Sequence, residues 1–368
     1  MRPAVHPVIA PEDLESAPIE RAWTIPSTWY TDPAFHAFDR DAIFARTWQG
    51  IGHLAQVRQP GDFFTAEIAD SPVLVLRDRD GTLRAFYNVC RHRGGPLATA
   101  HAGCVKALTC QYHGWTYLLD GSLRGVPRWD RVDLFDKKDY GLVPLRVETW
   151  QDQVFVNLDP DAAPLATVMA GIAERIAPVR LDSMTFVKRV DYEVACNWKI
   201  YVDNFLEGYH VPYVHPELMK LYDFRQYRTE VSEHHSLQWT ALTAGDAPYE
   251  IRPGDNAYYY CVFPNYMLNV LPGRVQTNLV VPLASDRCRV EFGFHYADAS
   301  GPAAQRAIAD DLEYSDRVQR EDMDICAHVQ RGVASRAYDR GRFSVDAEQG
   351  VHHFQELLRV AYRDWPRR

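Results

Sequence analysis

The sequence predicts an α+β protein whose two halves are organised differently. From about Thr47 to Leu158, short runs of Val, Leu, Phe and Tyr alternate with turn residues, which indicates a small β domain. Beyond residue 159, helical periodicity and strand-like runs are mixed, and two long helical stretches end the chain. At 368 residues and 46% apolar composition, the chain is large enough for two hydrophobic cores.

The first 45 residues are expected to form an arm that packs on the C-terminal domain. Thr31-Asp32-Pro33 is typical of a helix start, because Asp caps well and Pro suits the first turn. The apolar residues that follow it would dock the arm. A β domain over 46–158 comes next, built from strands such as 72–76, 117–119 and 153–157, with the turns Asp80-Gly81 and Asp120-Gly121.

The proline-rich segment 159–164 is a plausible boundary, so the third region spans 159–368. A helix-like stretch at 165–176 opens it, and another helix begins at Trp198. The remaining predicted elements are strands at 185–195, 236–242, 257–263, 275–282 and 288–296, and helices at 302–331 and 346–363.

Charge and cysteine usage narrow the functional classes. The net charge of −9 and the absence of a basic tract argue against nucleic acid or an anionic membrane as partner. No apolar run approaches about 18 residues, and the N-terminal sixteen residues lack a signal-peptide core. Five of the seven cysteines are scattered without paired spacing, as expected of free thiols in a reducing compartment. We therefore expect a cytoplasmic protein.

One pattern in the β domain points to a metal. Cys90, His92, Cys110 and His113 form C-x-H-x17-C-x2-H, which presents two thiolates and two imidazoles in two short clusters. Such a set suits a tetrahedral zinc ion, or a [2Fe–2S] centre in which two histidines replace two cysteines on one iron.

A second set of potential ligands lies in the C-terminal region. His210 and His215 are five residues apart, so on a regular helix their imidazoles would diverge by about 140°. They could share an ion only if the helix breaks between them, and Pro212 lies there. One more carboxylate would complete the facial triad that non-heme Fe(II) uses.

The long helix near the C-terminus supplies that carboxylate. Six apolar residues fall within about 80° of Asp322 at helical spacing: Ile308, Leu312, Val318, Ile325, Cys326 and Val329. An acid on an apolar face costs several kcal/mol unless it is paired or bound to a metal. Glu321 and Asp324 point about 100° and 160° away, so the periodicity selects Asp322, although an interhelical hydrogen bond could also satisfy it.

The flanking residues resemble one known family. Cys90-Arg-His-Arg-Gly-Gly-Pro and Cys110-Gln-Tyr-His-Gly-Trp-Thr-Tyr closely resemble the ligand loops of Rieske proteins, including the glycines that let backbone N–H groups approach the sulfides. The runs NWK, DNFLEGYHVPYVHP and EDMDICAHVQRG resemble the α subunit of Rieske non-heme iron oxygenases. The resemblance covers roughly residues 20–360, and the family includes choline, betaine and carnitine monooxygenase-like members.

The resemblance implies an all-β Rieske [2Fe–2S] domain followed by a helix-grip catalytic domain, with iron held by His210, His215 and Asp322. An acid three residues before the first iron histidine is usually Asp in this family and links it to the Rieske histidine of a neighbouring subunit. Here that position is Glu207, with Asp203 as the second candidate. The implied partners are a flavin/iron–sulfur reductase or ferredoxin fed by NAD(P)H, O₂, a small organic substrate and two further copies in a homotrimer.

The substrate is the least determined feature. The region expected to line the pocket is rich in aromatic residues, although most of these are expected to be core: Tyr213, Trp239, Tyr258, Tyr259, Tyr260, Phe263 and Tyr266. Aromatic faces can hold a quaternary ammonium by cation–π attraction or pack a planar ring. The aromatic residues fit either substrate. Glu207, the single-component architecture and the overall resemblance favour hydroxylation or N-demethylation of a betaine-type compound over ring hydroxylation of an aromatic acid. A Rieske electron carrier and a zinc-stabilised binding protein are remoter alternatives.

Overall fold

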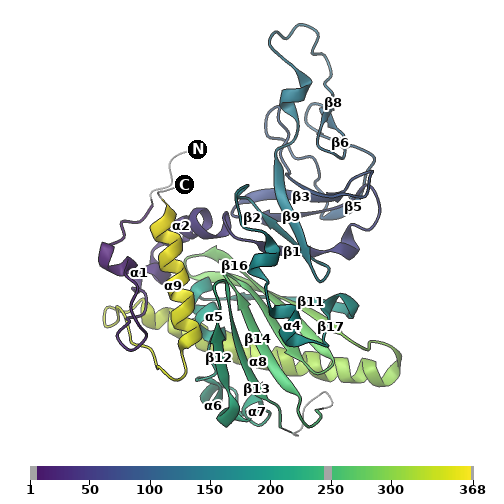
Figure 1. The fold of residues 1–368 in the computed structure, drawn as a ribbon. Helices are drawn as coiled ribbons and strands as arrows, with labels where there is room; N and C mark the ends of the chain where they lie inside the picture. Colours follow the sequence, from purple (N-terminus) through teal and green to yellow (C-terminus); the bar gives the residue numbers. More distant parts are fainter. Residues whose placement is uncertain (1–5, 244–250, 366–368) are drawn as a thin grey trace. The chain divides into compact units, whose positions relative to one another are not determined.

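The computed structural model describes residues 6–243 and 251–365, and the chain divides into two compact units. One unit is Phe44–Ala166, and the other combines Met1–Ile43 with Thr167–Arg368. Figure 1 shows the elements of both. The predicted α+β class is confirmed. The domain division expected from sequence stays a prediction, with regions 1–45, 46–158 and 159–368.

The first unit is built from strands. Its seven-stranded sheet has the order β1-β10-β9-β4-β3-β2-β5, and a three-stranded sheet has the order β6-β7-β8. The bounds are β1 Gln49–His53, β2 Asp62–Ile68, β3 Ser71–Arg77, β4 Leu83–Tyr87, β5 Ala102–Cys104, β6 Leu108–Thr109, β7 Thr116–Tyr117, β8 Leu123–Gly125, β9 Pro144–Trp150 and β10 Gln153–Asn157. One apolar cluster, to which strands of both sheets contribute, includes Cys90, Cys110, Trp115 and Tyr117, so the core of this unit supports the cysteine–histidine loops.

The second unit is a seven-stranded antiparallel sheet with the order β11-β17-β16-β15-β14-β13-β12. Its strands are β11 Thr185–Val194, β12 Arg228–Val231, β13 His235–Ala241, β14 Asn256–Val262, β15 Tyr266–Leu271, β16 Arg274–Ala284 and β17 Arg287–Tyr296. Two of these strands were not predicted from sequence: β12, which is a polar edge strand of four residues, and β15, which follows the turn at Pro264-Asn265.

The helices of this unit are α1 Thr28–Thr31, α2 Pro33–Asp39, α4 Ile172–Ile176, α5 Trp198–Phe205, α6 Val211–Val214, α7 Pro216–Met219, α8 Gly301–Val333 and α9 Gln349–Asp364. The helix expected over 165–176 is instead two short pieces, α3 Leu165–Val168 and α4, separated by Gly171 in a left-handed conformation. None of the described helices is long and apolar enough to cross a membrane.

Helix α8 crosses the sheet (Figure 1), and side-chain hydrogen bonds join the two. Tyr192 of β11 donates to Asp316 at 3.0 Å, and Tyr296 of β17 donates to Asp311 at 2.6 Å. These contacts fix the rotation of α8, and with it the direction of Asp322 two to three turns further along.

The N-terminal segment packs beside α9 in the same unit. As expected, α2 begins at Pro33, and Asp32 caps it by accepting from the Ala34 backbone N–H. Trp29 and Phe35 both pack on the ring of Tyr362 in α9. This aromatic contact holds the described N-terminal segment to the C-terminal helix.

Candidate functional site: two metal-binding regions and a cavity

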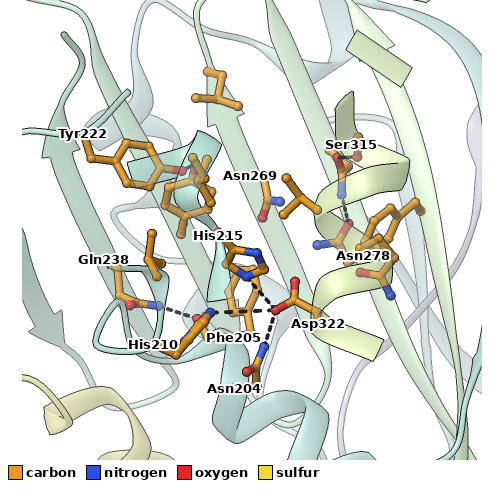
Figure 2. Close-up of a pocket in the computed structure, with 18 of the residues that line it drawn as sticks. Asn204, Phe205, His210, His215, Tyr222, Gln238, Asn269, Asn278, Ser315 and Asp322 are labelled. Carbon is orange, nitrogen blue, oxygen red and sulfur yellow. Dashed lines mark hydrogen bonds and ion pairs between the residues drawn. The ribbon is translucent and has the colours of Figure 1, made fainter. Parts of the chain in front are cut away.

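His210, His215 and Asp322 converge in the described structure. One ligand atom from each lies within 4.8 Å of the others. Asp322 Oδ1 is 3.0 Å from His215 Nε2 and 3.7 Å from His210 Nε2 (Figure 2). Two imidazoles and one carboxylate on a common point form the donor set of a facial-triad Fe(II) site.

Local chain breaks bring the two histidines together. Helix α5 ends at Phe205, His210 immediately precedes α6, and His215 lies between α6 and α7. Pro212 therefore does not break the helix between the histidines as expected. It occupies the first turn of α6, where its missing N–H costs nothing. The chain changes direction at the two histidines themselves.

Carboxylates hold the outer nitrogen of each imidazole. Glu207 Oε1 is 2.7 Å from His210 Nδ1, and Glu321 Oε2 is 2.7 Å from His215 Nδ1. Both histidines thus point Nε2 toward Asp322, and Asn204 Nδ2 donates to Asp322 Oδ1 at 2.7 Å. Burial lowers the pKa of His215, but hydrogen bonds and attraction from Asp322 and Glu321 outweigh it and raise that pKa. This excess of negative charge suits a divalent cation.

Glu321 and Asn204 were missed by the sequence analysis. Helix phase placed Glu321 on the polar side of α8, yet its carboxylate is long enough to reach His215 from there. The only sequence signal was its position beside Asp322. Asp203 is placed differently from Glu207: its carboxylate accepts from Tyr30 at 2.6 Å and from Gln355 at 3.1 Å, and it does not line the cavity described below.

The cysteine–histidine loops of the other unit share one backbone pattern. Cys90 N–H donates to Gly95 and Cys110 N–H donates to Trp115, both at 2.8 Å. Both cysteines are 2% exposed, and hydrogen bonding between their thiols is one cause of the raised pKa of Cys90, after burial itself. Gly95 has to lack a side chain, because a Cβ there would lie 2.9 Å from Cys110 Sγ.

The two histidines of these loops lie face to edge. The ring centroids of His92 and His113 are 4.7 Å apart, and His92 stacks on Trp115 at 4.9 Å. His92 Nδ1 is buried and has no hydrogen-bond partner among the described residues. A buried imidazole nitrogen without a partner is costly, so a group bound between the loops would satisfy it.

A cavity opens beside the histidine–aspartate site. Its empty volume is about 900 Å³, including the opening, and its wall includes Glu207, His210, His215 and Asp322. Of the seven aromatic residues considered from sequence, only Tyr259 lines it. The other aromatic lining residues are Tyr201, Phe205, Tyr222, Tyr227, Phe292 and Tyr314.

Comparison with known proteins settles the family. Residues 47–136 match the Rieske [2Fe–2S] domain, and residues 181–364 match the catalytic domain of the ring-hydroxylating alpha subunit. The chain is 38% identical to a chloroplastic choline monooxygenase of Arabidopsis thaliana, over 93% of this chain and 83% of the relative. The chain belongs to the ring-hydroxylating oxygenase family.

Two further relatives of this oxygenase cover nearly its whole length. It is 31% identical to the oxygenase subunit of an Acinetobacter baumannii carnitine monooxygenase, over 95% of this chain and 97% of the relative. A solved quaternary ammonium Rieske monooxygenase is similar with a TM-score of 0.83 and 29% identity, over 94% of this chain and 99% of that one. The expected family and enzyme class are therefore confirmed.

Membership in the family implies a Rieske cluster and a non-heme iron, and the residues present fit both. The unpartnered His92 nitrogen and the two adjoining thiols fit the cluster that the matched domain implies. The convergent histidine–aspartate set leaves one side open to the cavity, as a catalytic iron requires. This oxygenase uses O₂, a reductase partner and an organic substrate.

Proposed function

We propose that this oxygenase acts on a quaternary ammonium compound. The observation that carries the proposal is a cavity that joins aromatic faces to the histidine–aspartate site. Tyr222 and Tyr259 pack 6.2 Å apart, and Phe205 meets Tyr259 edge-on at 6.3 Å. Cation–π attraction to such faces contributes about 0.5–2 kcal/mol each. The relatives named above as choline and carnitine monooxygenases support this choice, because both compounds carry a trimethylammonium group.

The residue roles follow from the donor chemistry. Cys90, His92, Cys110 and His113 would hold the cluster, and His210, His215 and Asp322 the iron. When bound, the two groups supply one-electron transfer and O₂ reduction. Glu207 and Glu321 keep the Nδ1–H tautomer of their histidines, so each Nε2 remains available as a ligand. Residues 46–158 would form the cluster domain, and 159–368 with the arm 1–45 the catalytic domain.

We further infer a homotrimer in which His113 of one protomer contacts Glu207 of the neighbouring protomer. The electrons would come from NAD(P)H through the reductase. Glu207 is favoured over Asp203 because it contacts His210 directly, whereas Asp203 is engaged by Tyr30 and Gln355. Mixing Cys90→Ala chains with Asp322→Ala chains tests this inference. Hybrid trimers should recover activity that neither variant has alone, and inactive hybrids that assemble normally would rule the route out.

The substrate proposal is tested with purified oxygenase, a surrogate reductase and a panel of compounds. Choline, glycine betaine, carnitine and an aromatic acid are compared by O₂ uptake and by product analysis. Formaldehyde reports N-demethylation, and a new aldehyde on the substrate reports hydroxylation at carbon. Turnover of the aromatic acid alone, or cis-diol products, would overturn the proposal.

A further inference from the structure

The cavity has two chemically different walls. Figure 2 shows Tyr222 on one side, Asn278 and Ser315 on the other, and Asn269 between them above the histidine–aspartate site. The register explains this placement, because Asn269 of β15 lies opposite Tyr259 of β14 and Gln276 of β16. From β14 to β15 and β16, the lining therefore changes from aromatic side chains to side-chain amides.

Most of the amide wall is internally satisfied. Arg274 is paired with Asp311 and also donates to Gln276 Oε1 at 2.8 Å. Gln276 in turn donates to Asn278 Oδ1 at 2.8 Å and accepts from Ser315 at 3.2 Å. Arg274 lines the cavity, but Asp311 already neutralises its positive charge. This network is therefore not expected to bind a negatively charged group of the substrate.

Two other lining amides are incompletely satisfied in the described structure. Gln319 is 2% exposed; its Oε1 accepts from Tyr201 at 2.7 Å, but its Nε2 has no hydrogen-bond partner. Asn269 Oδ1 is also buried without a partner. A buried polar atom left unpaired costs about 1–3 kcal/mol, so both atoms are expected to meet a ligand.

We propose that Asn269 and Gln319 bind an uncharged hydroxyl group of the substrate, while its trialkylammonium group lies on the aromatic wall. This inference rests on the proposed function and narrows its substrate class to hydroxyl-bearing compounds. A hydroxyl both donates, as Asn269 Oδ1 requires, and accepts, as Gln319 Nε2 requires. A carboxylate only accepts, so it would leave Asn269 Oδ1 unpaired. It would also share the cavity with the carboxylates of Glu207 and Asp322, while Arg274 is already paired with Asp311.

The position of Gln319 indicates which end of the substrate lies near the histidine–aspartate site. It precedes Asp322 by three residues on α8, which is about 4.5 Å along the helix axis and nearly the same face. The hydroxyl end of the substrate thus lies toward the histidine–aspartate site, and the ammonium end toward Tyr222 and Tyr259.

Calorimetry on the metal-loaded oxygenase without reductase tests the inference, because no turnover occurs. The ligands are choline, ethyltrimethylammonium, which lacks the hydroxyl, and glycine betaine, which carries a carboxylate. Wild type should bind choline about tenfold more tightly than ethyltrimethylammonium, as one or two neutral hydrogen bonds allow. Asn269→Leu should remove that preference and leave ethyltrimethylammonium binding unchanged. This variant should fold, because the Asn269 side chain makes no hydrogen bond within the part of the chain that the structure describes.

Gln319→Met is the second variant and should also reduce the choline preference, with iron content confirming that Asp322 is undisturbed. Asn256→Leu, an amide on β14 that does not line the cavity, is the matched control and should behave as wild type. If Asn269→Leu weakens choline and ethyltrimethylammonium equally, or if betaine binds wild type more tightly than choline, the hydroxyl subsite is wrong and the proposed function stands. If none of the three binds, the proposed function itself fails.

Discussion

The cluster loops and the histidine–aspartate site hold their side chains by different means. In the loops, each ligand pair lies within four residues, and the same backbone hydrogen bonds recur in both: Gly94 N–H to Cys90 at 3.0 Å and Gly114 N–H to Cys110 at 2.9 Å. In the other site, Asp322 reaches His215 across 107 positions of sequence. The loops are thus organised by local backbone geometry, whereas the second site depends on the packing of α8.

The largest expected effect is that a substitution in either metal-binding region removes the metal of that region and leaves the other region loaded. Asp322→Ala should lose the mononuclear iron and all measurable turnover but keep the visible spectrum of the cluster, with iron falling from about three to about two per chain. Cys90→Ala should do the reverse and keep one iron. Asp324→Ala, an exposed acid on the same helix, is the control. Loss of the cluster spectrum in Asp322→Ala would show that the regions are not independent.

Because the loops are organised by local backbone geometry, we expect cluster content to fall when one methyl group is added at Gly95. In Gly95→Ala the new Cβ would lie 2.9 Å from Cys110 Sγ, so the loops would have to separate. Most chains should then lack the cluster, measured as absorbance per protein and as iron content. Gly125→Ala is matched to it, because nothing lies within 4 Å of a Cβ there. Full cluster content in Gly95→Ala would mean that the loops tolerate a wider spacing.

This difference also explains how far sequence analysis could reach. The four candidate ligands of the loops could be proposed from sequence, because ligands and glycines are adjacent there, and their role as cluster ligands stays a prediction. Asp322 was found because an acid on an apolar helix face is visible in the helix itself. Glu321 was not, because its partner His215 belongs to another segment. The aromatic wall was mostly missed because Tyr222 and Tyr227 lie in irregular chain, outside the strands that were considered.

An intermediate effect is expected at Glu207, whose carboxylate accepts from His210 Nδ1 and from the backbone N–H groups of Tyr209 and His210. In Glu207→Gln one oxygen becomes an amide that cannot accept these bonds. Turnover should fall about 10–100-fold, as for other groups that orient metal ligands, while iron content falls less. Glu233→Gln, at a highly exposed site, is the control. Unchanged O₂ uptake would remove Glu207 from the site chemistry.

The smallest effect concerns Asp203, four residues before Glu207 but turned toward Tyr30 and Gln355. Burial raises its pKa to about 7, although hydrogen bonds from Tyr30 and Gln355 oppose the shift. Since the unfolded value is about 3.9, the folded state binds more protons between those pH values, and stability falls as pH rises through that window. Asp203→Asn removes this titration. Relative to wild type, its melting temperature should therefore rise by several degrees between pH 5 and pH 8. Parallel pH profiles would show that Asp203 ionises normally, which would return it to consideration as the bridging acid beside Glu207.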